Sequence, residues 1–189
     1  WSGASAWPSS TLLKPRLIVT LTFVDGVLFR TKRFVPDYRY TTNYIDGGAD
    51  EIFCIDLGGD RTAFWGAVEK IADQTFVPIA VGGGIHTVAD VREALLHGAD
   101  KVVVNRAFLD DRATVRRMAD KFGCQCITVG IDVMDGIAYA SHGTTLCGEV
   151  VGWARLAAKY GAGELFIQSI DRDGSLLGYD LELLGAVVA

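Results

Sequence analysis

A short segment of the chain occurs twice, first near the start and again beyond the middle of the sequence. Its copies read LTFVDG at residues 21–26 and IDVMDG at residues 131–136, and each joins an apolar, strand-like run to an Asp-Gly turn. Apolar runs alternate with helical patterns between the copies, so the second begins four strand–helix units after the first. A unit that recurs after four strands favours a (β/α)8 barrel made of two halves over a doubly wound sheet, whose strand order reverses at a switch point.

A glycine-led corner also recurs, and it precedes every second predicted strand. It reads GADE at residues 48–51, GADK at 98–101 and GAGE at 161–164. The predicted strands span residues 16–23, 52–57, 78–81, 102–105, 126–131 and 165–170, and the predicted helices 40–46, 63–72, 88–97, 110–122, 149–160 and 181–188. We therefore expect an α/β fold of the (β/α)8 TIM-barrel type with about six of its eight βα units present. It would form one domain over residues 13–189, after a tail at residues 1–12.

Charge and cysteine content narrow the class of protein. The chain has 189 residues and a net charge of −5. The absence of an apolar run of about 18 residues argues against a membrane span, and the acidic balance argues against nucleic acid as the main partner. Cys54, Cys124, Cys126 and Cys147 form no Cys-x-x-Cys pair, which indicates reduced thiols rather than metal ligands or disulfides. The sequence thus predicts a cytoplasmic protein without cofactor or metal, and without nucleic-acid or membrane association.

Three consecutive glycines, at residues 82–84, separate the predicted strand 78–81 from a helix. Thr87 has the place of the helix N-cap, and Asp90 follows it at the spacing of a capping box. Glycines at such a junction leave backbone N–H groups unobstructed near a helix start, which is typical of a phosphate cradle. The alternative is a tight turn that merely needs positive φ.

In a barrel of this type, function resides at the C-terminal ends of the strands. A pair of carboxylates on opposite strands there would serve as general acid and base. Asp132 ends the fifth predicted strand, but the repeat puts Thr22 at the corresponding place on the first. Asp132 could alternatively cap a turn, and the charged loop at residues 171–174 could be a simple type I turn.

Charged residues also stand at the opposite ends of the predicted strands. They are Arg16, Glu51, Lys101 and Glu164, at the starts of strands one, two, four and six. Two positive and two negative charges facing one another would form a neutral ring at the bottom of the barrel, whereas burial without partners would be costly. The alternative is four unrelated surface charges.

Several segments resemble the cyclase subunit family of imidazole glycerol phosphate synthase. They are VGGGI at 81–85, GADKVVVN at 98–105, GID at 130–132 and SIDRDGSLLGYD at 169–180. The SIDRDG segment favours this cyclase over its sister isomerase of histidine synthesis. The resemblance covers about residues 13–189, as far as the sixth helix of that barrel. It implies that Asp132 is the strand-five catalytic acid and that Thr22 replaces the strand-one acid.

The resemblance also implies binding residues and a partner. Gly83, Gly84 and Asn105 match a phosphate site, and further positions line the substrate site: Asp56, Gln168, Asp173 and Gly174, with Gln168 in place of a smaller hydroxyl residue. In that family, a ring like the one formed by Arg16, Glu51, Lys101 and Glu164 gates the entry of ammonia from a glutaminase subunit. A phosphorylated small molecule would be the substrate.

Three functions remain open at this point. The chain could take ammonia from a glutaminase and close an imidazole ring on a phosphoribosyl compound. It could instead be a diverged relative that delivers ammonia to another acceptor, such as a sugar nucleotide, which the loss of the strand-one acid would suit. It could also be a non-catalytic barrel fragment that binds phosphate or a partner. Without strands seven and eight, strands one and six would have open edges, so we expect self-association.

Overall fold

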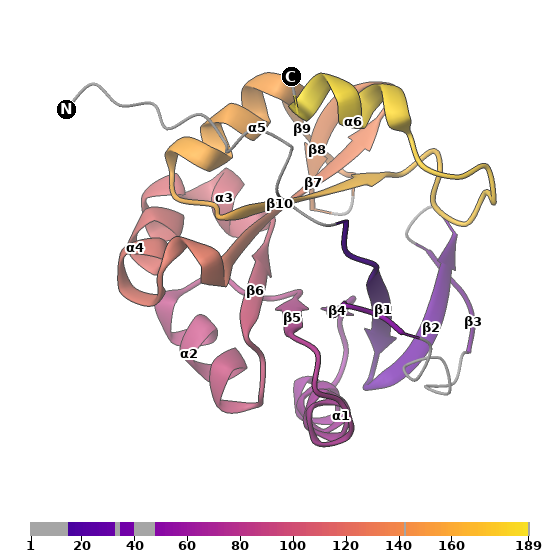
Figure 1. Cartoon of the computed structure of the whole chain (residues 1–189), viewed down its shortest axis with the longest axis vertical. Helices are drawn as coiled ribbons and strands as arrows, with labels where there is room; N and C mark the ends of the chain where they lie inside the picture. The colour runs from indigo at the N-terminus through magenta and orange to yellow at the C-terminus, as the bar shows by residue number, and fades with distance from the viewer. Residues whose placement is uncertain (1–14, 33–34, 40–47, 142, 189) are drawn as a thin grey trace.

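Six parallel strands organise the computed structural model of the chain, which describes residues 15–32, 35–39, 48–141 and 143–188 (Figure 1). They are β1 (Ile18–Val24), β4 (Glu51–Asp56), β5 (Ile79–Gly82), β6 (Lys101–Val104), β7 (Ile127–Met134) and β10 (Glu164–Ser169). Each pairs with the next in that order. This order never reverses, so the fold is of the TIM-barrel type and not a doubly wound sheet. The expected tail at 1–12 and short helix at 40–46 lie outside the described residues.

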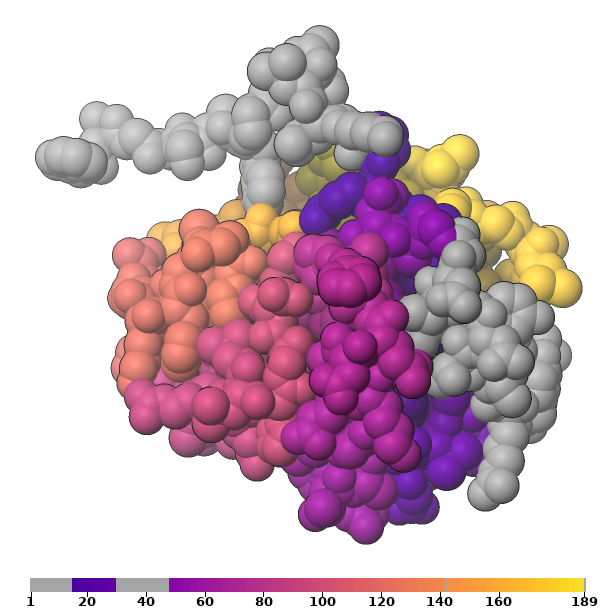
Figure 2. Space-filling view, turned by 60° about the horizontal axis from the view of Figure 1, so that its bottom comes forward, coloured from indigo at the N-terminus to yellow at the C-terminus, as the bar shows by residue number. Residues whose placement is uncertain are grey.

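Helices cover the outer face of these strands (Figure 1). They are α1 (Arg61–Gln74), α2 (Val88–Leu96), α4 (Arg112–Phe122) and α5 (Val150–Lys159), and α6 (Leu181–Val188) lies beside α5. Phe64 and Val68 of α1, Val91 of α2 and Met118 of α4 are fully buried against the sheet and form the main core. Figure 2 looks onto this outer surface, with α1 in magenta facing the reader.

The predicted start of α2 after Thr87 is confirmed by its capping bonds, whereas α1 and α4 begin two residues from their predicted starts, at Arg61 and Arg112. Thr87 accepts a hydrogen bond from the N–H of Asp90, and the Asp90 carboxylate accepts one from the N–H of Thr87, which is the expected capping box. Asp60 and Asp111 cap α1 and α4 in the same way, through side chains that accept from backbone N–H groups of the first turn. These caps satisfy donors that a helix start would otherwise leave unpaired.

The glycine-led corners lock each new strand to its predecessor. The Asp50 carboxylate accepts a 2.8 Å hydrogen bond from the N–H of Leu17, and the Asp100 carboxylate accepts one of 2.9 Å from the N–H of Ile79. At the third corner Gly163 has no side chain, and a Cβ there would lie 2.4 Å from the Cys124 carbonyl oxygen. The recurring corner is therefore a structural device that sets the register of neighbouring parallel strands.

The repeated segments are two equivalent β-hairpins. Asp25 and Gly26 join β1 to β2 (Val27–Lys32), and Asp135 and Gly136 join β7 to β8 (Ile137–Ala140). All four turn residues have positive φ, as a type I′ turn requires. Further strands, β3 (Val35–Arg39) and β9 (Thr145–Glu149), extend the two hairpins.

Some element boundaries differ from the sequence prediction. β7 continues to Met134 because its end pairs with β8, and it begins at Ile127 because residues 124–126 form a 3₁₀ turn, η2 (Cys124–Cys126). A short helix, α3 (Arg106–Asp110), and strand β9 were not predicted. These elements are short, and their hydrophobic periodicity is too brief to identify them.

The expectation of two open edges was only partly right. β10 pairs with β7 alone among the described strands, so its other edge is open there. On β1, however, Thr22, Phe23 and Val24 are covered on the side away from β4 by antiparallel pairing with β2. The Asp-Gly turn folds the chain back onto this edge, so among the described strands only the first half of β1 lacks a partner there.

The cysteines of the described residues are free thiols. Burial raises the pKa of the Cys54 thiol to about 12, so this residue is an inert core side chain. No helix in the described ranges is long and apolar enough to span a bilayer.

Candidate active site

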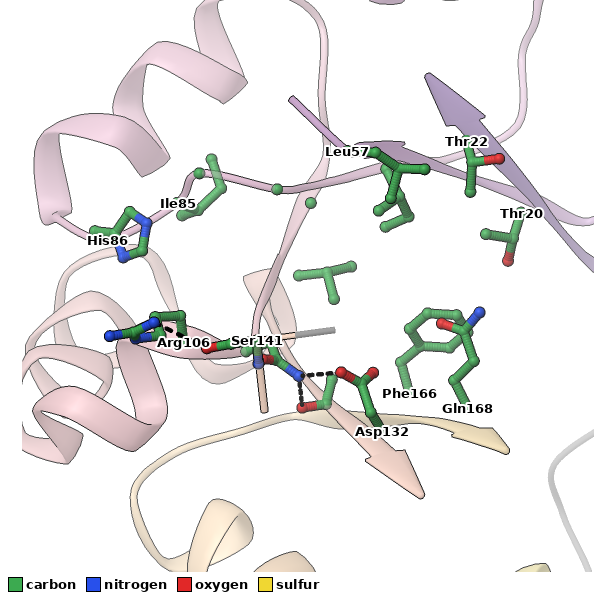
Figure 3. Close-up of a pocket in the computed structure, with 17 residues that line it drawn as sticks. Thr20, Thr22, Leu57, Ile85, His86, Arg106, Asp132, Ser141, Phe166 and Gln168 are labelled. Atoms are coloured by element: carbon green, nitrogen blue, oxygen red, sulfur yellow. Dashed lines mark hydrogen bonds between the residues drawn. The ribbon is translucent and has the colours of Figure 1, made fainter. Parts of the chain in front are cut away.

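A cavity of about 300 Å³ opens at the C-terminal ends of the parallel strands. Alternate residues of a strand face the same side, which brings inward-facing side chains from several strands to this end. The strand residues that line the cavity are Thr20, Thr22, Ile55, Gly82, Val103, Gly130, Asp132, Phe166 and Gln168. The segments outside these strands add Leu57, Gly83, Gly84, Ile85, His86, Asn105, Arg106 and Ser141 (Figure 3).

The glycine turn forms one wall of this cavity. Gly83 and Gly84 have φ values of +87° and +66°, and a Cβ on Gly83 would lie 2.0 Å from the Asp56 carbonyl oxygen. Within the described residues, no hydrogen bond uses the N–H groups of Gly83, Gly84 or Ile85. The turn therefore needs glycine for its conformation, as the tight-turn interpretation expected, and it also retains donors that a ligand could engage.

Asn105, which follows β6, orients Asp132 of the neighbouring strand β7. Its Nδ2 donates to Asp132 Oδ2 at 3.3 Å and to the Gly130 carbonyl oxygen at 3.1 Å, as the dashed lines of Figure 3 show. Its Oδ1 accepts a 2.8 Å hydrogen bond from the N–H of Ser141. With the amide held on both sides, Asn105 fixes the carboxylate of Asp132 in the wall of the cavity.

Thr22 lines the cavity on β1, as the repeat with Asp132 predicted. Its Oγ1 donates a 2.6 Å hydrogen bond to the carbonyl oxygen of Phe29 on β2. The hydroxyl proton is committed to that bond, so toward the cavity Thr22 offers an acceptor and no titratable group. Asp132 is thus the only carboxylate among the described residues that line the cavity.

Figure 3 shows the two ends of the cavity. Thr20, Thr22 and Gln168 lie at one end, and His86 and Arg106 lie at the other, with Ile85 and Ser141. Arg106 Nη1 donates to Ser141 Oγ at 3.1 Å, and its Nε forms an ion pair with Asp110. The basic end and the glycine turn together suit an anionic group.

Sequence reasoning missed several of these lining residues. Arg106 directly follows Asn105 and His86 directly follows the VGGGI segment, so their adjacency to predicted site residues was the available signal. Ser141 stands in the connection between β8 and β9, a hairpin that was not predicted. No sequence signal connected it to Asn105.

Three predicted binding residues lie outside the cavity lining. The Asp56 carboxylate accepts hydrogen bonds from the N–H of Gly58 at 2.9 Å and from Arg61 Nη1 at 2.8 Å. Asp173 and Gly174 lie in the turns that follow β10, where the N–H of Asp173 donates to the Ser169 carbonyl oxygen. Gln168, by contrast, lines the cavity. No group of three or more His, Cys, Asp or Glu side chains in the described ranges could hold a metal ion.

The four charged residues at the N-terminal ends of the strands meet in a closed ring. Arg16 donates to Glu51 Oε2 at 2.8 Å and to Glu164 Oε1 at 2.7 Å. Lys101 Nζ donates to both Glu164 oxygens at 3.0 Å. It also lies 2.9 Å from Glu51 Oε1, an ion-pair contact whose angle is not that of a hydrogen bond. Each cation therefore contacts both anions, which excludes the alternative of four unrelated surface charges.

Burial differs around the ring. Glu51 is completely buried, whereas the side chain of Arg16 is 45% exposed. Burial tends to raise the pKa of Glu164, but hydrogen bonds from Arg16 and Lys101, together with their charges, outweigh it and hold that pKa below its usual range. The hydrogen bond to Glu164 likewise raises the pKa of Arg16.

The depressed pKa of Glu164 predicts acid sensitivity. Its stabilising contribution is present above the unfolded-state pKa, about 4.3, and is lost as pH falls through the lower folded-state value. Urea unfolding measured between about pH 5 and pH 3 should therefore show stability falling with pH, and Glu164→Gln should flatten this dependence. An unchanged slope in the variant would rule out this ring as the source.

Comparison with known proteins identifies relatives over most of the chain. The model of a family described as "Histidine biosynthesis protein" matches residues 19–189. The imidazole glycerol phosphate synthase subunit HisF of Myxococcus xanthus (strain DK1622) is 41% identical over 192 residues, which cover 93% of this chain and 75% of the relative. The same subunit of Desulfovibrio desulfuricans (strain ATCC 27774 / DSM 6949 / MB) is 36% identical over 196 residues, which cover 93% and 76%.

Proposed function

The chain belongs to the histidine biosynthesis protein family, and on that premise we propose that it acts as the cyclase of imidazole glycerol phosphate synthase. Ammonia would attack a phosphoribosyl compound bound in the cavity, and the imidazole ring would close. Cleavage would give imidazole glycerol phosphate and an aminoimidazole ribotide. One observation carries the proposal: the cavity unites Asp132 with a glycine turn whose N–H groups have no partner among the described residues, and a closed charge ring lies at the opposite ends of the strands.

Each part of the cavity has a role in this proposal. The N–H groups of Gly83 and Gly84 would bind one phosphate, with Arg106 beside them. Asp132, held by Asn105, would take and return protons during ring closure. The substrate site would also depend on residues outside the cavity lining, which would hold the surrounding loops in place. These residues are Asp56, Asp173 and Gly174.

We propose that ammonia passes from the charge ring to the cavity through the interior of the barrel. Above the ring, Phe53, Ala80 and Val103 form an apolar layer with Phe166 packed against it. Thr128 precedes Gly130 and Asp132 on the same face of β7, and its buried hydroxyl has no hydrogen-bond partner among the described residues. A buried donor of this kind would suit a small polar molecule such as ammonia in transit.

A glutaminase subunit is the partner that this proposal implies. Ammonia would enter at the ring, so the glutaminase would dock at the N-terminal ends of the strands. Leu17 and Phe76, which precede β1 and β5 at that end, are exposed apolar side chains. Exposed apolar residues beside a charged entrance are consistent with a protein interface.

One observation favours an alternative function, in which ammonia is delivered to a different acceptor. Thr22 offers no carboxylate opposite Asp132, so the described residues that line the cavity supply no pair of carboxylates for acid–base chemistry. A diverged enzyme that delivers ammonia to a sugar nucleotide would not need that pair. Co-purification with a glutaminase would support either enzyme and would exclude a barrel that only binds phosphate.

We also propose that a second copy of the chain covers the edges of β10 and of the first half of β1 that have no partner among the described strands. Light scattering that gives a monomer at micromolar concentration would contradict the self-association.

We further propose that the protein resides in the cytoplasm, whose reducing conditions would suit its free thiols.

The phosphate site predicts the effect of Gly84→Val. A Cβ on Gly84 would lie 3.5 Å from Arg61, an ordinary contact, but φ of +66° is incompatible with a β-branched side chain. The turn must then move, and we expect phosphate binding to be lost in an NMR titration of the ¹⁵N-labelled chain.

The matched control for this experiment is Gly136→Val. Gly136 also has positive φ, but it lies in the β7–β8 turn and does not line the cavity. It should leave phosphate binding intact. Phosphate-induced shifts confined to other parts of the protein would refute the site.

A further inference from the structure

Arg61 lies directly behind the glycine turn, outside the cavity lining. Its Nη1 donates to the carbonyl oxygen of Gly83 at 2.8 Å and to Asp56 Oδ2, also at 2.8 Å. These two bonds use both hydrogens of that nitrogen. One guanidinium nitrogen thus ties the end of β4 to the turn that follows β5.

The guanidinium is itself held in place from other sides. It stacks over the Trp65 ring at 4.3 Å and lies 5.2 Å from the Phe64 ring centroid. Its anchor, Asp56, is almost buried and is fixed in turn by the N–H of Gly58. Arg61 is also the first residue of α1, whose start is capped by Asp60. Its position is therefore determined by the barrel and does not depend on a ligand.

The geometry of the peptide group gives this contact a consequence inside the cavity. In a trans peptide the C=O of one residue and the N–H of the next point in opposite directions. The Gly83 carbonyl is directed at Arg61, so the N–H of Gly84 is directed away from it. Two adjacent glycines do not define this orientation themselves, because glycine populates positive and negative φ about equally.

We propose that Arg61 is a positioning residue that sets the orientation of the Gly83–Gly84 peptide, and with it the N–H group presented to a phosphate. The inference rests on the phosphate site of the proposed function. Arg61 acts through the peptide and not by its charge, because its charge is paired with the Asp56 carboxylate. Losing the contact frees the peptide to turn its carbonyl oxygen toward the anion, which repels it.

Titration with inorganic phosphate, followed by ¹H–¹⁵N NMR, tests this inference. Arg61→Met should weaken binding about tenfold, the effect expected for loss of one charge-assisted hydrogen bond. It should also shift the Gly84 amide resonance before any phosphate is added, which a general loss of stability would not do. Arg116→Met is the matched control, since Arg116 forms an exposed ion pair with Asp120 on α4. It should change neither the affinity nor the Gly84 resonance.

Asp56→Asn separates positioning from simple electrostatics. Removing this negative charge would strengthen phosphate binding if charge alone mattered. Positioning predicts weaker binding, because an asparagine cannot accept from both Arg61 and Gly58 through separate oxygens. Arg61→Lys keeps the charge but loses the planar guanidinium that stacks over the Trp65 ring, so it should recover only part of the affinity.

The possible outcomes are distinct. Unchanged affinity in Arg61→Met, or tighter binding in Asp56→Asn, would overturn the positioning role and leave the phosphate site standing. Absence of phosphate-induced shifts at Gly84 in the unmodified chain would overturn the site itself, and the inference with it. Weaker binding in both variants, together with the shifted Gly84 resonance, would establish the role.

Discussion

Replacement of Lys101 by methionine is expected to lower the free energy of unfolding by about 3 kcal/mol, the scale reported for breaking a buried ion pair from one side. Glu51 is completely buried, and Lys101 is its contact on one side of the ring. Methionine would keep most of the apolar volume of the lysine stem but would leave Glu51 and Glu164 to share Arg16. Urea unfolding at neutral pH measures the loss.

Two further variants test whether charge balance is the cause. Lys101→Met combined with Glu51→Met leaves Arg16 and Glu164 as a neutral pair, so most of the lost stability should return. Arg116→Met removes one partner of an exposed pair and should cost at most about 0.5 kcal/mol. A Lys101→Met variant no less stable than this control would show that the ring contributes nothing.

Thr22→Asp is expected to raise ammonium-dependent ring closure by about 10²-fold or more, the typical contribution of a general acid or base. The unmodified chain should turn over very slowly, because Thr22 has no group that titrates near neutral pH. The aspartate would face Asp132 from the opposite strand of the cavity. The Thr22 hydroxyl donates a hydrogen bond to the Phe29 carbonyl oxygen, and an ionised aspartate has no proton to donate in its place. The aspartate side chain should therefore turn into the cavity.

The control for this gain is Thr20→Asp. Thr20 lies two residues earlier on the same face of β1 and lines the same cavity. It adds the same charge but one step deeper in the barrel, and it should give no comparable increase. An equal gain from both variants would indicate a general effect of charge. Full activity in the unmodified chain would show that the strand-one acid is not needed.

The features that sequence could predict are those encoded by local pattern or repetition. The Asp-Gly segments repeat because both form type I′ turns, and this repetition predicts the barrel from sequence. The corner residues Asp50 and Asp100 recur because each binds the backbone at the start of the preceding strand. The charge ring followed from strand starts alone, since parallel strands bring their ends to one side.

What sequence could not predict depends on contacts between distant segments. Arg61 lies outside the helix predicted at residues 63–72 and was not singled out, because its partner is a backbone carbonyl that the sequence pattern does not reveal. Asp56 was assigned to the substrate site by the family resemblance, and the sequence held no sign that its side chain contacts Arg61. Ser141 meets Asn105 only through a hairpin whose short strands lack a clear period.

The central claim is that this cavity closes an imidazole ring with ammonia, and isotope labelling tests it most directly. The unmodified chain would be incubated with the phosphoribosyl substrate and ¹⁵N-ammonium, and the products would be read by mass spectrometry. The account predicts slow formation of imidazole glycerol phosphate carrying one ¹⁵N, abolished by Asp132→Asn. The absence of labelled imidazole glycerol phosphate from both the unmodified chain and Thr22→Asp, while phosphate still binds at Gly84, would contradict it.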